Sequence, residues 1–288
     1  MTGKILVTGA GGRVGALVVR ELVGAGAEVR AGARTPQRLS VPEGVEVVAA
    51  DLTRPETLPD ALKDVSSIFL YAVPDGAGAV AEAAAAAGVE HVVLLSSHTS
   101  LEVQSIPERA PLAAMHETVE DAVTAAGLEY TFLRPANFAS NVLLWGWDSM
   151  IRADGVVRFP YPDSHSDAIH ERDIAAVAAT VLTSADRAHR GASYSITGPE
   201  SVSQREQADL IGRAIGRPVR FEEVTPQDAR RALGEHVPDW VLDATLAYWA
   251  ATDGIPYAVN DLVASITGRP ALTFGRWAID HRDDFTPS

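Results

Sequence analysis

The sequence predicts an α/β fold, with a doubly wound parallel sheet followed by a smaller C-terminal α/β lobe. Three observations lead to this prediction. The chain of 288 residues begins with a short apolar run, a glycine-rich turn and a helical pattern of apolar residues. Strand-like and helix-like segments then alternate through the first half of the chain, as they do in parallel α/β sheets. The continuous apolar run 91–95 is typical of a strand buried on both faces of such a sheet.

The glycine-rich turn lies between the first predicted strand and the first predicted helix. Residues 4–7 are apolar β-formers, and the apolar residues of 14–22 recur at helical spacing. At such a junction glycines allow a tight turn, a close approach of a ligand's pyrophosphate and close packing of the helix on the sheet. Free amides and the positive end of the helix dipole then face the phosphates. We therefore expect a dinucleotide site here, rather than an ordinary glycine-rich loop. The residues assigned to it are Thr8, Gly9, Gly11, Gly12, Arg13, Val14 and Gly15.

The second predicted strand, 28–34, ends where a dinucleotide-binding fold meets the adenosine ribose. Enzymes of this kind that prefer NAD usually place a carboxylate there, and this strand end has none. It has Arg34 and Arg38 instead, two cations that can grip a 2′-phosphate through charge-assisted hydrogen bonds. The pattern predicts that NADP(H) is preferred over NAD(H). The alternative is a solvated basic corner of the surface.

Further strand ends are expected to complete the cofactor site. A third strand at 45–48 leads to Asp51 and Leu52, which could meet the adenine edge and face; a plain turn before the next helix explains them almost as well. The strands at 66–71, 91–95 and 130–133 all end at the carboxyl edge of the sheet, where ligands bind in such folds. The residues expected to shape the nicotinamide end are Ala72, Val73, Pro74, Ser96, Ser97, Pro135, Asn137 and Phe138.

The sequence of the second half predicts that the chain forms two interleaved structural units, a domain and a lobe. We expect a nucleotide-binding domain over 1–155, to which 168–198 returns, and a substrate-side lobe from 199–288 together with 137–167. Scattered aromatic residues in 137–167 suit the wall of a substrate pocket, although packing alone would also explain them. Asp173 is interpreted as the N-cap of the helix that follows it.

Composition excludes several classes of partner. The chain carries 24 Lys and Arg against 38 Asp and Glu, a formal net charge of −14, so its surface repels nucleic acid and anionic membranes. It has no cysteine, and a reducing cytoplasm is its simplest setting. No apolar stretch approaches the length of a membrane span, and no signal peptide is expected before the first strand. We expect a cytoplasmic protein with a small-molecule partner and no metal site; whether it forms a homodimer is left open.

Several stretches resemble one known family. They are residues 8–15, 33–35, 51–52, 92–97, 133–135, 172–175, 197–199 and 210–218. Together they make the chain similar to the atypical short-chain dehydrogenase/reductases of the NmrA-like type. That group includes NADPH-dependent quinone reductases, triphenylmethane reductase, isoflavone-reductase-like enzymes and nitrogen-regulator sensor proteins. The resemblance implies a Rossmann-like domain and a small C-terminal substrate lobe.

The chain departs from this pattern where the ordinary short-chain reductases carry a Tyr-x-x-x-Lys pair. Leu112 stands at the Tyr position and His116 at the Lys position, while the usual catalytic Ser or Thr falls near His98. Reducing an unactivated ketone needs an acid, which contributes ~10²–10⁴ in rate. Quinones and cationic dyes need no such acid, because their hydride adducts are stabilised phenolates or neutral leuco compounds. The resemblance and this departure predict an NADPH-dependent oxidoreductase for an electron-poor, quinone-like or conjugated carbonyl substrate.

Two alternatives stay open at this point. In the first, a biosynthetic ketone or enone reductase uses His116 as its proton donor, because an imidazole is a competent acid near neutrality; His98 is the second catalytic candidate. In the second, the protein is a non-catalytic, NADP(H)-sensing regulator, which the loss of both the Tyr and the Lys would favour.

Overall fold

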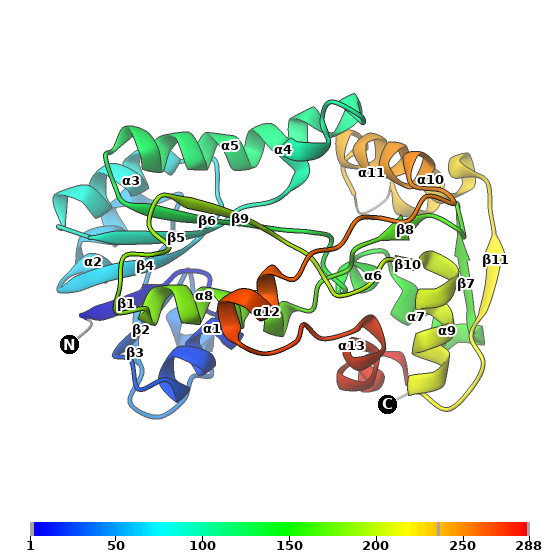
Figure 1. Cartoon of the computed structure of the whole chain (residues 1–288), viewed down its shortest axis with the longest axis horizontal. Helices are drawn as coiled ribbons and strands as arrows, with labels where there is room; N and C mark the ends of the chain where they lie inside the picture. Colours follow the sequence, from blue (N-terminus) through cyan, green and yellow to red (C-terminus); the bar gives the residue numbers. More distant parts are fainter. Residues whose placement is uncertain (1–2, 235–236, 287–288) are drawn as a thin grey trace.

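A seven-stranded parallel sheet forms the centre of the computed structural model, which describes residues 3–234 and 237–286. The strand order is β3-β2-β1-β4-β5-β6-β9, so the chain runs outward from β1 and then crosses back to β4 (Figure 1). The gap between the carboxyl ends of β1 and β4 is therefore the topological switch point of the sheet. The predicted α/β fold is confirmed. The strands are β1 (Lys4–Val7), β2 (Val29–Ala33), β3 (Glu46–Ala49), β4 (Val65–Tyr71), β5 (His91–Leu95), β6 (Tyr130–Pro135) and β9 (Ala192–Ile196).

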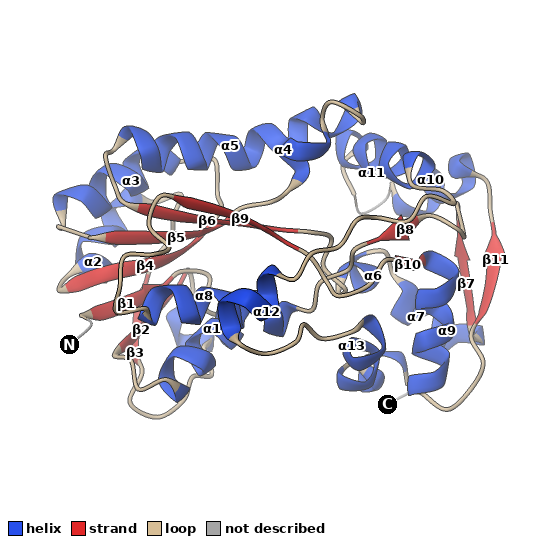
Figure 2. Cartoon of the chain, in the orientation of Figure 1, coloured by secondary structure: helices blue, strands red, loops and turns tan. Residues whose placement is uncertain are grey.

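Helices cover both faces of this sheet (Figure 2). On one face pack α1 (Arg13–Gly24), α8 (Glu171–Thr183) and α12 (Leu262–Thr267). On the other pack α2 (Leu58–Leu62), α3 (Ala77–Ala86) and α5 (Ala110–Ala125). Burial of apolar side chains on both faces explains why the central strands β1 and β5 are nearly continuous hydrophobic runs. Over the described part of the chain, no helix combines the length and the apolar character needed to span a bilayer.

A smaller group of elements lies beyond the carboxyl edge of the sheet, and we call it the second lobe (Figure 1). Its two short sheets pair β7 with β11 and β8 with β10. Its core is aromatic, with Trp147 and Trp277 fully buried and Trp147 edge-on to Phe159. The elements are α6 (Asn141–Leu144), α7 (Trp147–Asp154), β7 (Val156–Phe159), β8 (His165–Ser166), β10 (Val202–Ser203), α9 (Gln204–Ala214), β11 (Arg220–Glu223), α10 (Pro226–Leu233), α11 (Asp239–Ala251) and α13 (Phe274–Asp280).

The chain passes between the sheet and this lobe several times. After α7, β7 and β8 it returns through α8 to β9, which pairs in parallel with β6. It leaves again for β10 to α11, and α12 packs against the sheet before α13 rejoins the second lobe. Short helical turns lie between these elements or, for the last one, after α13. They are η1 (Pro36–Arg38), η2 (Pro55–Thr57), α4 (Thr99–Glu102), η3 (Pro107–Arg109) and η4 (Arg282–Phe285).

The interpretation of Asp173 as an N-cap is wrong. Helix α8 begins two residues earlier, and His170 is the N-cap, because its side chain accepts a hydrogen bond from the amide of Arg172. Asp173 lies in the first turn and is 3% exposed, and its carboxylate accepts the amide of Leu272 at 2.7 Å. Its role is to fasten the segment between α12 and α13 to α8.

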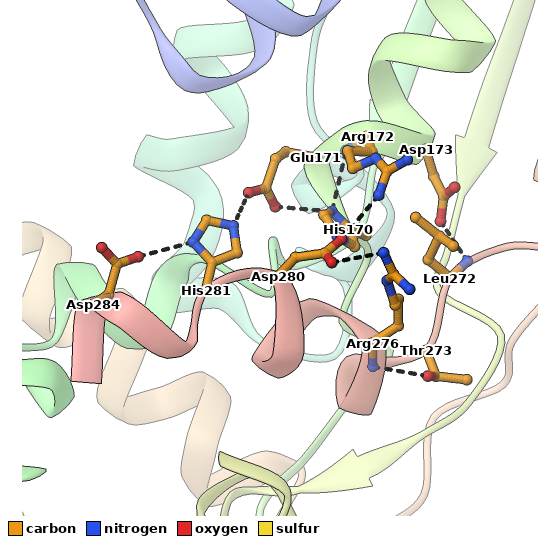
Figure 3. A network of polar contacts seen from close by, with 10 residues as sticks. All are labelled: His170, Glu171, Arg172, Asp173, Leu272, Thr273, Arg276, Asp280, His281 and Asp284. Atoms are coloured by element: carbon orange, nitrogen blue, oxygen red, sulfur yellow. Dashed lines mark hydrogen bonds and ion pairs between the residues drawn. The ribbon is translucent and has the colours of Figure 1, made fainter. Parts of the chain in front are cut away.

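Two histidines join α8 to the end of the chain (Figure 3). His281 Nε2 lies 2.6 Å from Glu171 Oε1, and His281 Nδ1 lies 2.8 Å from Asp284. His170 lies between Glu171 and Asp280, at 3.3 and 3.4 Å. Burial by itself lowers the pKa of His281, but the hydrogen bonds to Glu171 and Asp284 outweigh it, so its pKa lies above the ordinary value. The network therefore holds the C-terminal segment most firmly when His281 is protonated.

The first turn of α1 depends on a glycine. A Cβ at Gly15 would lie 2.2 Å from the carbonyl oxygen of Gly9, a distance at which the backbone must shift. We expect Gly15→Ala to lower the free energy of unfolding by about 1–3 kcal/mol and to weaken dinucleotide binding, because helix and turn are forced apart. Urea unfolding and titration with NADPH measure both effects.

Gly24 is the matched control for this substitution, because nothing lies within 4 Å of a Cβ added there. Gly24→Ala should leave stability unchanged or raise it by up to about 1 kcal/mol. Equal stability of the two variants would contradict the importance of the Gly9–Gly15 contact.

The C-terminal network makes stability depend on pH. Because the pKa of His281 is raised in the folded chain, its contribution is fully present below the unfolded pKa of about 6.5 and is lost as pH rises through the folded pKa. Between pH 6 and pH 9, we expect the wild-type free energy of unfolding to fall by roughly 1–2 kcal/mol more than that of His281→Gln. His189→Gln, which removes a histidine bonded to the Tyr194 hydroxyl, is the control. Parallel curves for the wild type and His281→Gln would contradict this contribution.

Candidate active site

A cavity of about 280 Å³ lies between the carboxyl edge of the sheet and the second lobe. One wall comes from the residues that follow β5 and β6, including Ser97, His98 and Asn137, and from one side of α5, where His116 lies. The other wall comes from the second lobe, with Tyr248 among its polar residues. An apolar part of the lining is formed by Leu112, Val142, Leu144, Trp145, Val241 and Trp249. The cavity thus combines hydrogen-bonding groups from both walls with an apolar lining that includes Trp145 and Trp249, whose rings lie edge to face.

The glycine-rich turn leaves the N-terminus of α1 open. Gly9 has φ +61°, a conformation that favours glycine, and Gly12 precedes the helix without a side-chain cap. No acidic side chain lies in the first turn of α1. Arg13 and Val14 are the next residues of that turn, so uncapped amides and the positive end of the dipole are available to an anion. These features fit a bound diphosphate.

Thr8 has a structural use that the sequence did not reveal. Its hydroxyl donates to the carbonyl of Phe69 at 3.0 Å and accepts the amide of Tyr71 at 2.8 Å. The side chain is 2% exposed. It joins β1 to β4 at the switch point of the sheet, so this hydroxyl holds the turn in place and has no free hydrogen for a ligand.

The two predicted 2′-phosphate cations lie at the end of β2. Arg34 follows the strand directly and Arg38 ends η1, and both side chains are exposed. Asp51 accepts both the hydroxyl and the amide of Thr53, at 2.8 and 3.1 Å, and these bonds, with a smaller effect of the Arg34 charge, lower its pKa. Leu52 is 8% exposed and belongs to the core below. The geometry here favours the turn role for Asp51 and Leu52 over an adenine contact.

The residues predicted around the nicotinamide fall into two groups. Ala72, Val73 and Pro74 follow β4 and are half-buried, but they do not line the cavity. Those after β5 and β6 line it, except Pro135, whose carbonyl accepts the amide of His98 at 3.2 Å. The structure therefore brings together Ser96, Ser97, His98, His116, Asn137 and Phe138 at one cavity.

The two serines after β5 have opposite roles. Ser96 donates its hydroxyl to Glu120 Oε1 at 2.5 Å, and Glu120 also pairs with Arg134, so the Ser96 hydrogen is used inside the fold. Ser97 accepts the amide and the hydroxyl of Thr99, at 3.3 and 3.2 Å. The hydroxyl hydrogen of Ser97 is not used in these two bonds, and Ser97 lines the cavity. Ser97 can donate a hydrogen bond to an oxygen atom in the cavity.

His116 lies in the cavity wall, as its place in the predicted helix suggested. Burial lowers its pKa below the ordinary value, against a smaller opposing effect of the Glu120 carboxylate. Its Nδ1 atom is buried and makes no hydrogen bond within the described residues. The side chain is therefore mainly neutral at pH 7, a state that accepts a hydrogen bond more readily than it gives up a proton.

A buried charged cluster adjoins the cavity, and of its members only His98 was predicted from the sequence. Glu102 pairs with Arg109 at 2.6 Å and accepts the Tyr257 hydroxyl. His98 lies 3.5 Å from Glu102 and 3.9 Å from Asp167. Burial raises the pKa of Asp167, partly offset by the nearby His98. Only the spacing of His98 and Glu102, four residues apart, was available as a signal, because the other members come from distant loops.

The cluster continues to the side chains that close the cavity from the second lobe. Arg109 stacks over the ring of Tyr248, with its guanidinium carbon 4.6 Å from the ring centre. The Tyr248 hydroxyl accepts from Asn137 at 2.9 Å and donates to the carbonyl of His165 at 3.2 Å. These contacts fix the two walls of the cavity relative to each other.

Comparison with known proteins agrees with this geometry. A family model described as NAD(P)H-binding matches residues 9–185, which include the glycine-rich turn and most of the sheet. The chain is 40% identical over 289 residues to a (4-alkanoyl-5-oxo-2,5-dihydrofuran-3-yl)methyl phosphate reductase of Streptomyces griseus, covering 98% of this chain and 99% of the relative. It is 33% identical over 290 residues to an NAD(P)H azoreductase of Xenophilus azovorans, covering 98% and 99%.

Solved structures resemble the whole chain. The triphenylmethane reductase of Citrobacter sp. superposes with a TM-score of 0.80 at 23% identity, covering 97% of this chain and 99% of that one. An NADPH-dependent quinone oxidoreductase of Escherichia coli superposes with a TM-score of 0.77 at 26% identity, covering 95% and 98%. The resemblance to the NmrA-like type is thereby confirmed. The chain belongs to the NAD(P)H-binding, NmrA-like atypical short-chain dehydrogenase/reductases, and it is an NAD(P)H-dependent oxidoreductase.

Proposed function

We propose that the protein uses NADPH to reduce an electron-poor conjugated carbonyl or quinone-like compound. The observation that carries this proposal is the cavity, which combines hydrogen-bonding groups such as Ser97 with an apolar lining that includes Trp145 and Trp249. It lies at the carboxyl edge of the sheet, where ligands bind in doubly wound folds. A conjugated acceptor fits this lining, because its apolar part can pack against Trp145 or Trp249 while its carbonyl faces Ser97.

The names of two relatives support an unsaturated acceptor. One specifies an acylated dihydrofuranone and the other specifies azo compounds. The named dihydrofuranone has a carbon–carbon double bond conjugated with carbonyl groups, and an azo compound has a double bond between two electronegative nitrogen atoms. Both kinds of double bond can accept hydride. The described cavity-lining residues include no Tyr-Lys pair, since Leu112 and His116 occupy those positions. This composition suits acceptors that stabilise their own reduced form.

The chain's own residues position the reaction. The cofactor supplies hydride when bound. Uncapped amides at the start of α1 hold its diphosphate, and the residues after β5 and β6 bring the acceptor to the same edge of the sheet. Ser97 donates to the acceptor's carbonyl oxygen, which gains negative charge during hydride transfer. The apolar part of the lining limits the access of water and so strengthens this hydrogen bond.

The two remaining alternatives have less support. His116 as the proton donor is disfavoured by its lowered pKa, which leaves few imidazolium molecules near neutrality. A purely sensing protein would bind the cofactor and leave the cavity without use, whereas the named relatives of comparable length are reductases.

Arg34 and Arg38 test the proposed preference for NADPH. Both are exposed at the end of β2, where the 2′-phosphate would lie. Arg34→Ala should weaken NADPH binding by about tenfold to 100-fold and leave NADH binding within about threefold, because a charge-assisted hydrogen bond contributes roughly 1.5–3 kcal/mol. Fluorescence titration with both cofactors gives the ratio. Arg231→Ala, an exposed arginine of α10, is the control; an unchanged ratio in Arg34→Ala and Arg38→Ala refutes their role.

The acceptor class is tested by an NADPH oxidation assay. We expect turnover with cyclic enones, acylated dihydrofuranones and quinones, and none with saturated ketones, because the latter need an acid of the Tyr-Lys kind. Ser97→Ala should lower kcat/KM for the carbonyl acceptors by about tenfold to 100-fold while NADPH affinity stays the same. Thr118→Ala, an exposed hydroxyl on α5, is the matched control. NADPH binding with no turnover of any acceptor would contradict the proposed function.

A further inference from the structure

The apolar part of the cavity lining leads from the interior of the molecule to its surface. Val142 is 4% exposed and Trp249 is 6% exposed, whereas Leu144, two residues after Val142 on α6, is 63% exposed. All three side chains line the same cavity. Within residues 3–234 and 237–286, Leu144 has the largest exposed fraction of any large apolar side chain. The cavity therefore opens to solvent at Leu144, and its apolar lining continues out to that opening.

Aromatic packing holds this lining in place. Trp145 follows Leu144 in the chain and lies edge to face with Trp249, with 5.4 Å between the ring centroids. Trp249 in turn lies edge-on to the buried Phe159 at 4.7 Å, which anchors the lining in the core of the second lobe. Helix α11 also adds Val241, eight residues before Trp249 and so about 12 Å from it along the helix axis. The apolar surface is therefore long enough to contact a chain of several carbon atoms.

The lining offers little free charge to a substituent of the acceptor. No Asp or Glu is among the described residues that line the cavity, although the chain as a whole has a formal net charge of −14. Arg109 is the one guanidinium of this lining in the described part of the chain, and it already lies 2.6 Å from Glu102. An anionic substituent would meet a cation that is already paired, and a cationic substituent would meet no carboxylate in the lining. The cavity therefore favours an uncharged, apolar substituent.

We propose that this lining binds an unbranched alkyl substituent of the acceptor, which leaves the cavity over Leu144, and that the enzyme thereby selects acceptors by chain length. The inference rests on the proposed function and adds a substrate class to it. We call the lining the alkyl subsite, and it consists of Val142, Leu144, Trp145, Val241 and Trp249. Binding removes water from the alkyl chain and from Leu144, and the gain in affinity follows the apolar area that is covered. These contacts are the same before and during hydride transfer, so they lower KM and leave kcat nearly unchanged.

A homologous series of acceptors tests the alkyl subsite. The acceptors are 2-alkylcyclopent-2-enones with one, three, five and seven carbon atoms in the alkyl group, which share the same reacting double bond. In the wild type we expect kcat/KM to rise roughly two- to fourfold for each added CH₂ and to level off once the chain has passed Leu144, because each buried CH₂ adds to the affinity. The value of kcat should stay within about threefold across the series. A kcat/KM that does not depend on chain length overturns the proposal.

Leu144→Ser removes the apolar side chain at the opening. For the one-carbon acceptor, kcat/KM should stay within about threefold of the wild type, because this short substituent does not reach Leu144. For the seven-carbon acceptor it should fall about fivefold to 20-fold, so the dependence on chain length becomes weaker. Ile279→Ser is the matched control, because Ile279 of α13 is 51% exposed and does not line the cavity. An unchanged dependence on chain length in Leu144→Ser, or an equal loss for short and long acceptors, overturns the role of Leu144.

A charge at the end of the chain tests the path of the substituent. When the terminal methyl group of the seven-carbon chain is replaced by a carboxylate, kcat/KM should change by less than about fivefold, because the chain end lies in water beyond Leu144. A loss of about 100-fold or more would mean that the chain ends inside the molecule, and it overturns the exit over Leu144.

Binding without turnover separates this inference from the proposed function. The saturated 2-alkylcyclopentanones have no double bond to reduce, and calorimetric titration of the wild-type protein with NADP⁺ present measures their affinity. We expect the affinity to rise with chain length and the heat-capacity change of binding to become more negative, with a smaller effect of chain length in Leu144→Ser. Absent binding, or an affinity that does not depend on chain length, overturns the alkyl subsite. If the affinity rises with chain length but the NADPH-bound wild type reduces none of the enones, the proposed function fails and the alkyl subsite stands.

Discussion

The structure depends on the close approach of the first helix to the turn that precedes it. With no side chain at Gly15, α1 lies against the carbonyl of Gly9. Thr8 ties the same turn to β4 through two hydrogen bonds. These contacts aim the N-terminus of α1 at the switch point of the sheet, and they place a diphosphate and the cavity at the same edge. A residue larger than glycine at position 15 would displace the N-terminus of α1 and, with it, the site for the diphosphate.

The second constraint is the burial of charge between the two lobes. Glu102 and Arg109 come from the segment after β5, Asp167 from the segment before α8, and Tyr257 from the segment after α11. Their ion pair and hydrogen bonds join parts of the chain that are far apart in the sequence. Arg109 of this cluster also lines the cavity, so the contacts that align the lobes also affect the electrostatics of the site.

The sequence predicted the local features well. The strands, the glycine-rich turn and α1 follow from patterns within about ten residues, and these patterns correctly predicted the fold and the family. Features that depend on contacts between residues far apart in the sequence could not be predicted from such local patterns. Asp173 was assigned to a cap because only its neighbours were visible, whereas its partner, Leu272, lies about a hundred residues away. For the same reason Asp167 had no visible connection to His98.

The repeated passage of the chain between the sheet and the second lobe has a consequence for how this protein can change over time. Neither the sheet with its helices nor the second lobe is formed by one continuous stretch of chain. β9 is a strand of the sheet and α12 packs against it, whereas segments before, between and after them belong to the second lobe. A recombination event that exchanged all segments of the second lobe at once would therefore also replace β9 and disrupt the sheet. New substrate preferences in this architecture therefore have to arise by point substitutions and small insertions in the connecting segments, with the cofactor half preserved.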